Sequence, residues 1–338
     1  MAKAYALTDG FGLERLALVD WPAEPLPDGH VRLSIEAVSL NRRDLLVVEG
    51  RYAPRLRMPA IPCSDAAGHV VEPGPGCTRF TKGDRVVAHM FPDWLAGPPT
   101  AEALRASLGG PVRQGTLRTE IVLPEAALLA VPPHLDVREA ATLPCAALTA
   151  WSAIAKFGAV GPRRSVLIQG TGGVSIFALQ FAKLFGATVV ATSSHPEKLE
   201  RLRALGADAV VNYRTDPNWA ETAKGHVGGA FDLIIEVAGE VDAALRMVRP
   251  GGMVALIGVL TGATAQITLP LVVMRQVALQ GVTCGTREDF GDMLAAMTAA
   301  PLHPIISDVF PFARARDAFV AMRDGTHFGK IVIDVAAG

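Results

Sequence analysis

Between residues 165 and 258, short apolar runs alternate with segments of helical pattern, and this alternation constrains the fold more than any other feature. The apolar runs are SVLIQG, TVVATSS, AVVNY, FDLIIEVA and MVALIG, and the helical segments include VSIFALQFAKLFG and HPEKLERLRALG. Strands that are apolar along their whole length are buried on both faces, as in parallel sheets. The pattern therefore predicts an α/β domain with a doubly wound parallel sheet.

The preceding residues have a different texture. Short strand-like runs bounded by turn residues, such as HVRLSIEAVSL and GDRVVAHM, have the spacing of a small all-β barrel. The tail supplies helices and a last β-branched strand that is expected to return to this first domain. Two domains agree with a length of 338 residues. We predict a β-barrel domain from 1–128 and 290–338, and an α/β domain from 129–289.

Composition narrows the partners and the compartment. The formal net charge of −1 provides no basic field for nucleic acid or for an anionic membrane surface. The N-terminus lacks the apolar core of a signal peptide, and no stretch reaches the roughly 20 apolar residues of a membrane span, so we expect a cytoplasmic protein. The four cysteines are far apart and form no CxxC pair, which argues against a disulfide scaffold. Small molecules are the expected partners.

Glycines are concentrated where the first strand of the α/β domain meets its helix, in IQGTGGVSIFALQFAK. A turn without side chains lets backbone N–H groups and the positive end of a helix face a pyrophosphate. Ser175 stands at the last position of G-x-G-x-x-G/A, where a small side chain still permits close packing. The alternative is that the glycines serve only the turn. We predict a dinucleotide site; its first residues are Gly170, Thr171, Gly172, Gly173 and Val174.

The end of the second strand bears on the choice of coenzyme. A site specific for NAD usually has Asp or Glu there to bind the ribose hydroxyls. This chain has Ser193 and Ser194 instead, with Lys198 in the following helix. Hydroxyls and an ammonium group favour a 2′-phosphate, so we predict NADPH rather than NADH. The alternative for Lys198 is an exposed helix residue.

Several further stretches extend the analysis to the whole chain: SLNRRDLLVVEGRY (39–52), IPCSDAAGHVVEPGPG (61–76), AATLPCAALTAW (140–151) and GKIVI (329–333). With the glycine turn, they resemble medium-chain dehydrogenases/reductases of the zinc-free, quinone-oxidoreductase-like branch. The resemblance implies a GroES-like β-barrel catalytic domain that is interrupted by a Rossmann domain and completed by the tail. It also implies a homodimer through VALQGVTCGT (277–286), with a tetramer as the alternative.

The resemblance also bears on metal binding. Zinc-dependent members hold the catalytic metal with a Cys, a His-Glu pair and a second Cys. Here Asn41 stands at the first position, CSD (63–65) replaces the pair, and Cys145 is kept. One thiolate without an imidazole does not make a usual zinc site, so we expect no zinc. An alcohol dehydrogenase with zinc bound through Cys145 and Asp65, or a nucleotide-binding protein with little activity, remain alternatives.

Without a metal, the resemblance implies hydride transfer to quinones or α,β-unsaturated carbonyl compounds. Tyr52 is the candidate proton donor, since EGRY occupies the position of QGxY in enoyl reductases; the alternative is a packing role. Asn41 is a candidate donor to the substrate carbonyl or the ribose, or else a turn residue. The resemblance adds five cofactor contacts: Tyr213, Gly239, Gly258, Val259 and Lys330.

Overall fold

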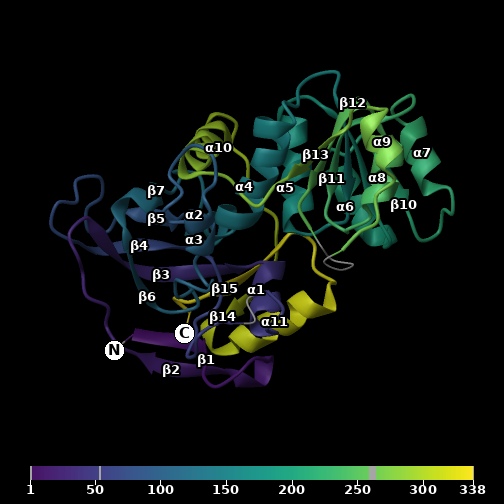
Figure 1. The fold of residues 1–338 in the computed structure, drawn as a ribbon. Coiled ribbons are helices and arrows are strands. Elements are labelled where there is room, and N and C mark those ends of the chain that lie inside the picture. Colours follow the sequence, from purple (N-terminus) through teal and green to yellow (C-terminus); the bar gives the residue numbers. More distant parts are fainter. Residues whose placement is uncertain (1, 53–54, 259–263, 338) are drawn as a thin grey trace. The chain divides into compact units, whose positions relative to one another are not determined.

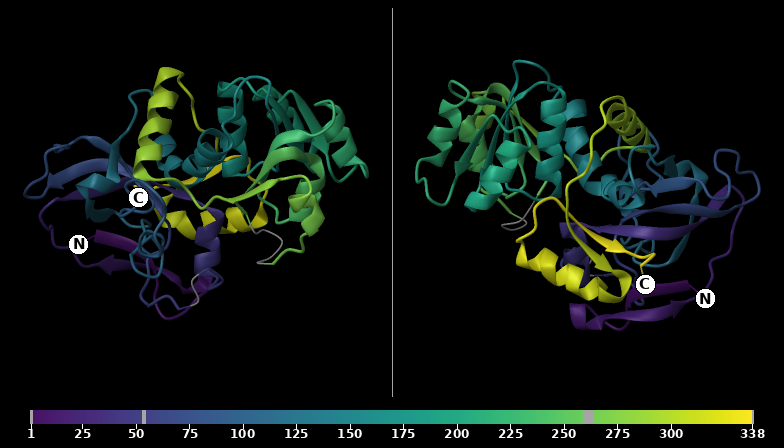
Figure 2. Two further views of the ribbon diagram at one scale, coloured as in Figure 1. Left: turned by 45° about the horizontal axis from the view of Figure 1, so that its top comes forward. Right: turned by 180° about the vertical axis from the view of Figure 1, so that it is seen from behind.

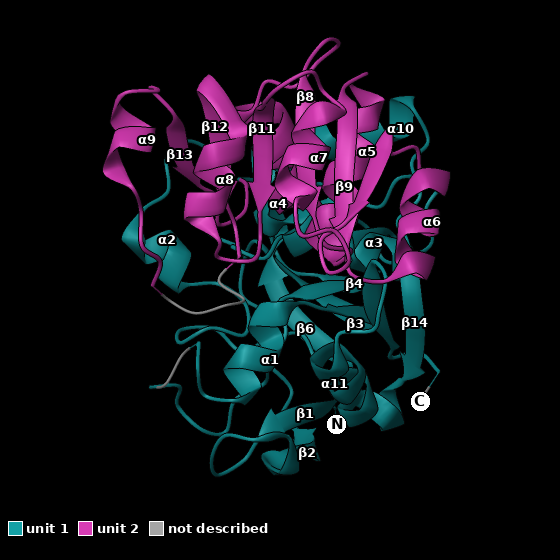
Figure 3. Cartoon of the chain, turned by 90° about the vertical axis from the view of Figure 1, so that its right-hand side faces the viewer, with its two compact units in different colours: residues 1–146, 286–338 teal, residues 147–285 magenta. Residues whose placement is uncertain are grey.

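The computed structural model describes residues 2–52, 55–258 and 264–337 and divides the chain into two compact units (Figures 1 and 3). Unit 1 comprises Met1–Ala146 and Thr286–Gly338, and unit 2 comprises Ala147–Gly285. The sequence pattern placed the two boundaries at 128/129 and 289/290. The segment before Ala147 carries helix α3 (Val137–Ala141), which packs against the sheet of unit 1. This packing explains why the segment belongs to unit 1.

Unit 1 is built on a seven-stranded sheet. Its strand order is β14-β15-β3-β4-β5-β7, and β6 also pairs with β3. The neighbouring strands are antiparallel except β14 and β15, which are parallel. A separate hairpin is formed by β1 (Ala2–Leu7) and β2 (Leu16–Trp21). The strands of the large sheet are β3 (His30–Leu40), β4 (Asp65–Pro73), β5 (Arg85–Ala88), β6 (Glu120–Pro124), β7 (Leu128–Ala130), β14 (Ile306–Pro311) and β15 (Lys330–Asp334).

The tail of the chain completes this sheet, as the sequence predicts. Strand β15 pairs with β3, with Ile331 opposite Leu40. Helix α11 (Ala315–Asp324) packs against β14 and β15 and also contacts α1 (Arg42–Val48) (Figure 2). Along the first part of β3, buried and partly exposed residues alternate, which directs one face into the core of unit 1. The remaining helices of unit 1 are α2 (Ala101–Arg105) and α10 (Arg287–Ala299).

Unit 2 is the predicted doubly wound domain. Its six strands are all parallel in the order β10-β9-β8-β11-β12-β13. The first strand in sequence, β8, lies centrally, and the order reverses between β8 and β11, which is where such sheets bind ligands at their carboxyl ends. The strands are β8 (Ser165–Gln169), β9 (Thr188–Ser193), β10 (Ala209–Asn212), β11 (Phe231–Glu236), β12 (Val248–Leu256) and β13 (Ala278–Gly281).

Helices connect the strands of unit 2, which confirms the predicted alternation. Val166, Leu167 and Ile168 of β8 are completely buried, as expected for a central strand covered on both faces. The helices are α4 (Leu148–Trp151), α5 (Gly173–Leu184), α6 (Pro196–Ala204), α7 (Trp219–Gly225), α8 (Val241–Met247) and α9 (Leu269–Val273). Among the residues that the structure describes, no helix is both long enough and apolar enough to cross a bilayer.

Candidate functional site

The glycine turn of unit 2 lies between β8 and α5 at the carboxyl edge of the sheet. Gly170 has a φ of 74°, a left-handed conformation that favours glycine, and its N–H donates to Thr192 O at 3.0 Å. Gly172 is the N-cap residue of α5 and makes no side-chain capping bond. A Cβ atom added at either glycine would meet no atom within 4 Å. The turn is therefore open around a helix N-terminus, which suits an anionic group.

Ser175 explains how the variant glycine pattern still closes the helix onto the strand. Its hydroxyl is buried and donates to Gln169 O, the last residue of β8, at 2.7 Å. The polar side chain is thus satisfied inside the turn rather than exposed to a ligand. Thr171 is also buried, whereas Gly172, Gly173 and Val174 are partly exposed.

The three residues that bear on coenzyme choice lie at the end of β9 and in the helix that follows it, α6. Ser193 is buried, and its hydroxyl accepts the His195 N–H at 3.3 Å. Ser194 Oγ lies 2.9 Å from His195 Nδ1. Lys198 on α6 is buried rather than an exposed helix residue, and burial lowers the pKa of its ammonium group, although Glu197 opposes this effect. A buried ammonium group on the helix that follows β9 is compatible with an anionic ligand at this end of the strand.

Glu236, at the carboxyl end of β11, is a residue that sequence reasoning missed. Its carboxylate is buried and accepts N–H groups from Ala238, Gly239 and Glu240 at 3.0 to 3.2 Å. Burial raises the pKa of Glu236, and these N–H groups act in the opposite direction. Gly239, with a φ of 99°, permits this tight turn. The only sequence signal was an acid at the end of an apolar run, FDLIIE.

Gly258 follows β12 and lies beside the same turn. Its N–H donates to Glu236 O at 3.3 Å, and an added Cβ would lie only 2.0 Å from Val237 O. Glycine is therefore required by the close approach of two backbone segments. Tyr213, just after β10, is exposed. Val259 was also predicted to contact the cofactor, but it lies outside the described residues.

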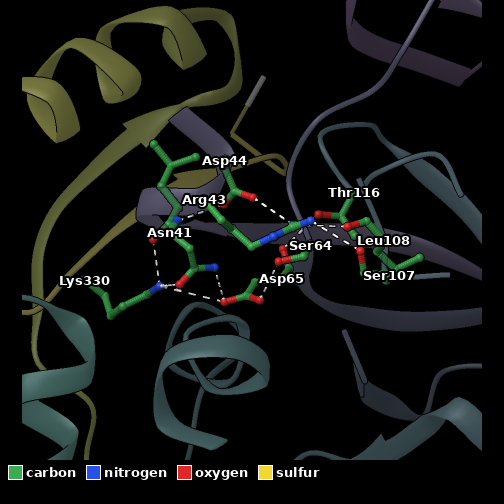
Figure 4. A network of polar contacts seen from close by, with 10 residues as sticks. Asn41, Arg43, Asp44, Ser64, Asp65, Ser107, Leu108, Thr116 and Lys330 are labelled. Carbon is green, nitrogen blue, oxygen red and sulfur yellow. Dashed lines mark hydrogen bonds and ion pairs between the residues drawn. The ribbon is translucent and has the colours of Figure 1, made fainter. Parts of the chain in front are cut away.

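A buried polar network occupies unit 1 where β3, β4 and β15 lie side by side (Figure 4). The register places Ser39 opposite Asp65 and Ile331 opposite Leu40. Asn41, which follows β3, therefore meets the first residues of β4 and β15, Asp65 and Lys330, at the same end of these three strands. Asn41 Nδ2 donates to Asp65 Oδ2 at 2.8 Å. Lys330 Nζ donates to Asn41 Oδ1 at 2.6 Å and to Leu40 O at 2.7 Å, and it lies 3.7 Å from Asp65 Oδ2.

This placement changes the interpretation of Lys330. The resemblance assigned it to the cofactor, yet its side chain is only 3% exposed and its ammonium group is bonded to two oxygen atoms of its own unit. Two of its three N–H donors are thus used within unit 1. Burial raises the pKa of Asp65. The charge of Lys330 and the hydrogen bonds from Asn41 and Ser64 act to lower it.

A second charged pair extends the network. Arg43 donates to Asp44 Oδ1 at 3.2 Å and to Leu108 O at 3.1 Å, and Asp44 Oδ2 accepts the Asn41 N–H at 2.8 Å. Burial raises the pKa of Asp44 to about 6, although Arg43 acts to lower it. The Arg43 guanidinium also lies 5.0 Å from the centre of the Tyr52 ring. Tyr52 is 47% exposed, so this aromatic ring extends from the buried network to the surface of the described chain.

The donor set of the network bears on metal binding. Both Asp65 oxygens already accept hydrogen bonds, Oδ2 from Asn41 and Oδ1 from Ser64 at 3.2 Å. Cys63 is buried, and burial raises the pKa of its thiol well above the usual value, which disfavours the thiolate that binds metals. Within the ranges that the structure describes, no group of three or more His, Cys, Asp or Glu residues is arranged to hold a metal ion.

The sequence of each unit matches a known family of dehydrogenase domains. The family described as "Alcohol dehydrogenase GroES-like domain" matches residues 27–133, and "Zinc-binding dehydrogenase" matches residues 173–299. The class of protein that the fold and the glycine turn define is a two-domain, nucleotide-dependent dehydrogenase. The chain belongs to the medium-chain dehydrogenase/reductase superfamily, whose members are NAD(P)-dependent oxidoreductases, as the sequence predicts.

Individual relatives support this assignment over nearly the whole chain. A Schizosaccharomyces pombe protein named as a zinc-type alcohol dehydrogenase-like protein is 37% identical, covering 99% of this chain and 100% of its own. A crystal structure of a putative alcohol dehydrogenase from Sinorhizobium meliloti has a TM-score of 0.92 at 36% identity, covering 99% and 98% of the two chains. The NADPH-dependent alkenal/one oxidoreductase of Arabidopsis thaliana chloroplasts is 27% identical over 98% of this chain and 79% of its own.

Proposed function

We propose that this protein is an NADPH-dependent, metal-independent reductase that transfers hydride to quinones or α,β-unsaturated carbonyl compounds. The observation that carries the proposal is the contact between Lys330 and Asn41, because an internal ammonium group lies where zinc-dependent relatives are expected to bind their metal. The chain provides its own cation there.

The glycine turn supports the coenzyme part of the proposal. Gly170 and Gly172 leave space where a Cβ atom would otherwise lie, and the N-terminus of α5 faces that space. A 2′-phosphate could bind the hydroxyl groups of Ser193 and Ser194 and the buried ammonium group of Lys198. The position after the second strand where NAD-specific enzymes have an Asp or Glu that binds the ribose is occupied here by serine. NADPH, when bound, supplies the hydride. One of the relatives is itself named as NADPH-dependent.

The charges of the unit 1 network support metal independence. Asp65 and Lys330 form one buried pair, and Asp44 and Arg43 form another, so two carboxylates are balanced by two cations. A divalent cation on Asp65 would have to displace Asn41 Nδ2 and would repel the Lys330 ammonium group at close range. Such a site would be electrostatically unfavourable unless Lys330 moved or lost its proton.

Reduction of a conjugated carbonyl compound by hydride also needs a hydrogen-bond donor to the carbonyl oxygen and a source of one proton. When hydride adds to the electron-poor carbon, two electrons enter the acceptor and negative charge develops on its conjugated oxygen. We assign the Asn41 amide as the hydrogen-bond donor to that oxygen. The exposed Tyr52 phenol then delivers the proton that completes the saturated carbonyl compound or the hydroquinone.

Two features of unit 2 support the expected homodimer. Strand β13 is the last strand of its sheet, and the short helix α9 before it, together with its C-cap residue Met274, carries strongly exposed apolar side chains. Leu269, Val273 and Met274 are between 68% and 80% exposed. An edge strand beside exposed apolar groups is suited to pairing with a second copy. Sedimentation equilibrium of the wild type and of Met274→Asp tests this proposal, which predicts a dimer that the aspartate weakens.

We also propose a cytoplasmic location.

A panel of acceptors tests the function. Purified protein is assayed for NADPH and NADH oxidation with a naphthoquinone, an alkenone and an alkenal, and with the matching saturated ketone as control. The proposal predicts turnover of the quinone or of the conjugated acceptors, a preference for NADPH, and no reduction of the saturated ketone. Turnover of the saturated ketone alone, or of none of the acceptors, would contradict it.

A further inference from the structure

The two ends of the Asn41 side-chain amide are distinguished by their partners. An asparagine amide has nearly the same shape in its two flipped orientations, so hydrogen bonding decides between them. Lys330 has only N–H donors, and it approaches one end at 2.6 Å. The Asp65 carboxylate accepts at the other end at 2.8 Å. Figure 4 shows the amide held between these two charged groups.

A flip of this amide would be costly because both partners are buried and charged. Asp65 is fully buried and Lys330 nearly so. After a flip, the amide NH2 would face the ammonium group and the amide oxygen would face the carboxylate, so both contacts would be repulsive. Asp65 and Lys330, from two other strands, therefore select this orientation, and the capping box at the start of α1, in which the Asn41 side chain faces the Asp44 N–H, acts in the same sense.

Fixing the amide leaves one N–H with a defined direction. Asn41 Nδ2 carries two hydrogens, and one of them is used by Asp65. The bond from Lys330 to Oδ1 withdraws electron density from the amide, which makes its N–H groups stronger donors. The side chain of Asn41 keeps a small exposed fraction of 8%.

We propose that Lys330 and Asp65 are positioning residues that fix and polarise the Asn41 amide, so that its second N–H is presented to the oxygen of the bound acceptor. This inference rests on the proposed function, in which Asn41 donates to that oxygen. It assigns Lys330 an indirect role in turnover in place of a contact with the coenzyme.

The main alternative is that Lys330 only balances the charge of Asp65, and a pair of variants separates the two roles. Lys330→Met leaves a buried carboxylate without its cation, so it is compared with the double variant Lys330→Met/Asp65→Asn, in which both charges are removed. In the double variant, two neutral amides face each other, and no charged partner selects the orientation of the Asn41 amide. The matched control is Lys3→Met/Asp20→Asn, which removes an exposed pair joined at 2.6 Å on the hairpin of unit 1.

The expected result is a double variant that unfolds at the wild-type urea concentration but has a kcat lowered about tenfold or more, with less change in KM for NADPH. Loss of a single donor to a developing oxyanion lowers kcat by about 10²–10³, so partial disorder of the donor gives a smaller effect. The control should keep wild-type kcat. Wild-type kcat in the double variant would show that Lys330 serves charge balance alone, and would overturn the proposal.

A spectroscopic measurement tests the positioning without requiring activity. The wild type has three asparagines, at 41, 212 and 218, so ¹⁵N-asparagine labelling gives three side-chain amide signals in an NMR spectrum, and the double variant adds a fourth signal from position 65. The single variant Asp65→Asn, in which Lys330 is kept, identifies that fourth signal. We expect the Asn41 signal to shift and to split or broaden in the double variant, while Asn212 and Asn218 in unit 2 stay unchanged. An unchanged Asn41 signal would refute the inference. If the wild type reduces no acceptor, the proposed function fails, but this measurement still decides whether Lys330 holds Asn41.

Discussion

Replacing Gly172 with alanine is expected to weaken coenzyme binding while leaving the stability of the protein nearly unchanged. Gly172 has a φ of −75° and a ψ of 178°, which any residue adopts, and an added Cβ would meet no atom within 4 Å. Neither strain nor a clash therefore opposes the substitution. The change in the free energy of unfolding should stay within about 0.5 kcal/mol, as at unconstrained surface positions.

The same methyl group would occupy the open space in which we expect the pyrophosphate to lie. Displacing the phosphate from one backbone N–H group removes one charge-assisted hydrogen bond, worth about 1.5–3 kcal/mol. We therefore expect the dissociation constant of NADPH to rise by about 10- to 150-fold, since about 1.4 kcal/mol corresponds to a factor of ten.

Isothermal titration with NADPH and urea unfolding provide the two measurements. The matched control is Gly161→Ala, because Gly161 lies before β8, at its other end, and also has no atom within 4 Å of an added Cβ. The control should bind NADPH as the wild type does. Unchanged NADPH affinity in Gly172→Ala would refute the assignment of the glycine turn to the pyrophosphate.

Three further predictions follow from individual side chains. Lys198→Ala should weaken NADPH by about 1–3 kcal/mol and barely affect NADH in binding titrations, and equal weakening of both would remove the phosphate assignment. Tyr52→Phe should lower kcat for enones by about 10²-fold without changing NADPH affinity, and unchanged kcat would exclude the phenol as proton donor. Burial alone would raise the pKa of Asp232, but hydrogen bonds from Ser165, Arg164 and Arg249 lower it well below its usual range. The carboxylate therefore contributes stability at neutral pH that is lost as the pH falls below about 4. Asp232→Asn should lower the free energy of unfolding in urea by about 1–3 kcal/mol at pH 7 and by progressively less as the pH falls below about 4. An equal loss of stability at neutral and at acid pH would contradict this linkage.

The doubly wound parallel sheet of unit 2 was predictable because its signals are local. Apolar runs, helical patterns and the glycines of 170–173 each occupy consecutive residues, and the handedness and packing of α/β units restrict how they assemble. The return of β15 to unit 1 was also expected from a β-branched run at the end of the chain. Its pairing with β3, and the register that brings Lys330 to Asn41, were not predicted.

The polar network could not be predicted because its partners are distant in sequence. Asn41 and Lys330 are separated by 289 positions, and no local pattern indicates that a lysine is buried against an asparagine and an aspartate. The same reason explains the burial of Lys198, since an isolated lysine on a polar helix is usually exposed. Glu236 was missed because its three N–H partners come from the turn that its own carboxylate shapes.

The central claim is that this protein needs no metal ion for turnover. The dependence of activity on bound zinc tests it most directly. Turnover of an enone or quinone with NADPH is measured on one preparation before metal removal, after dialysis against a chelator and after zinc is added back, with zinc per chain determined in each sample. The account predicts equal turnover per chain in all three, because Lys330 already provides the cation beside Asn41 and Asp65. Turnover that falls with the zinc content and returns with added zinc would contradict it.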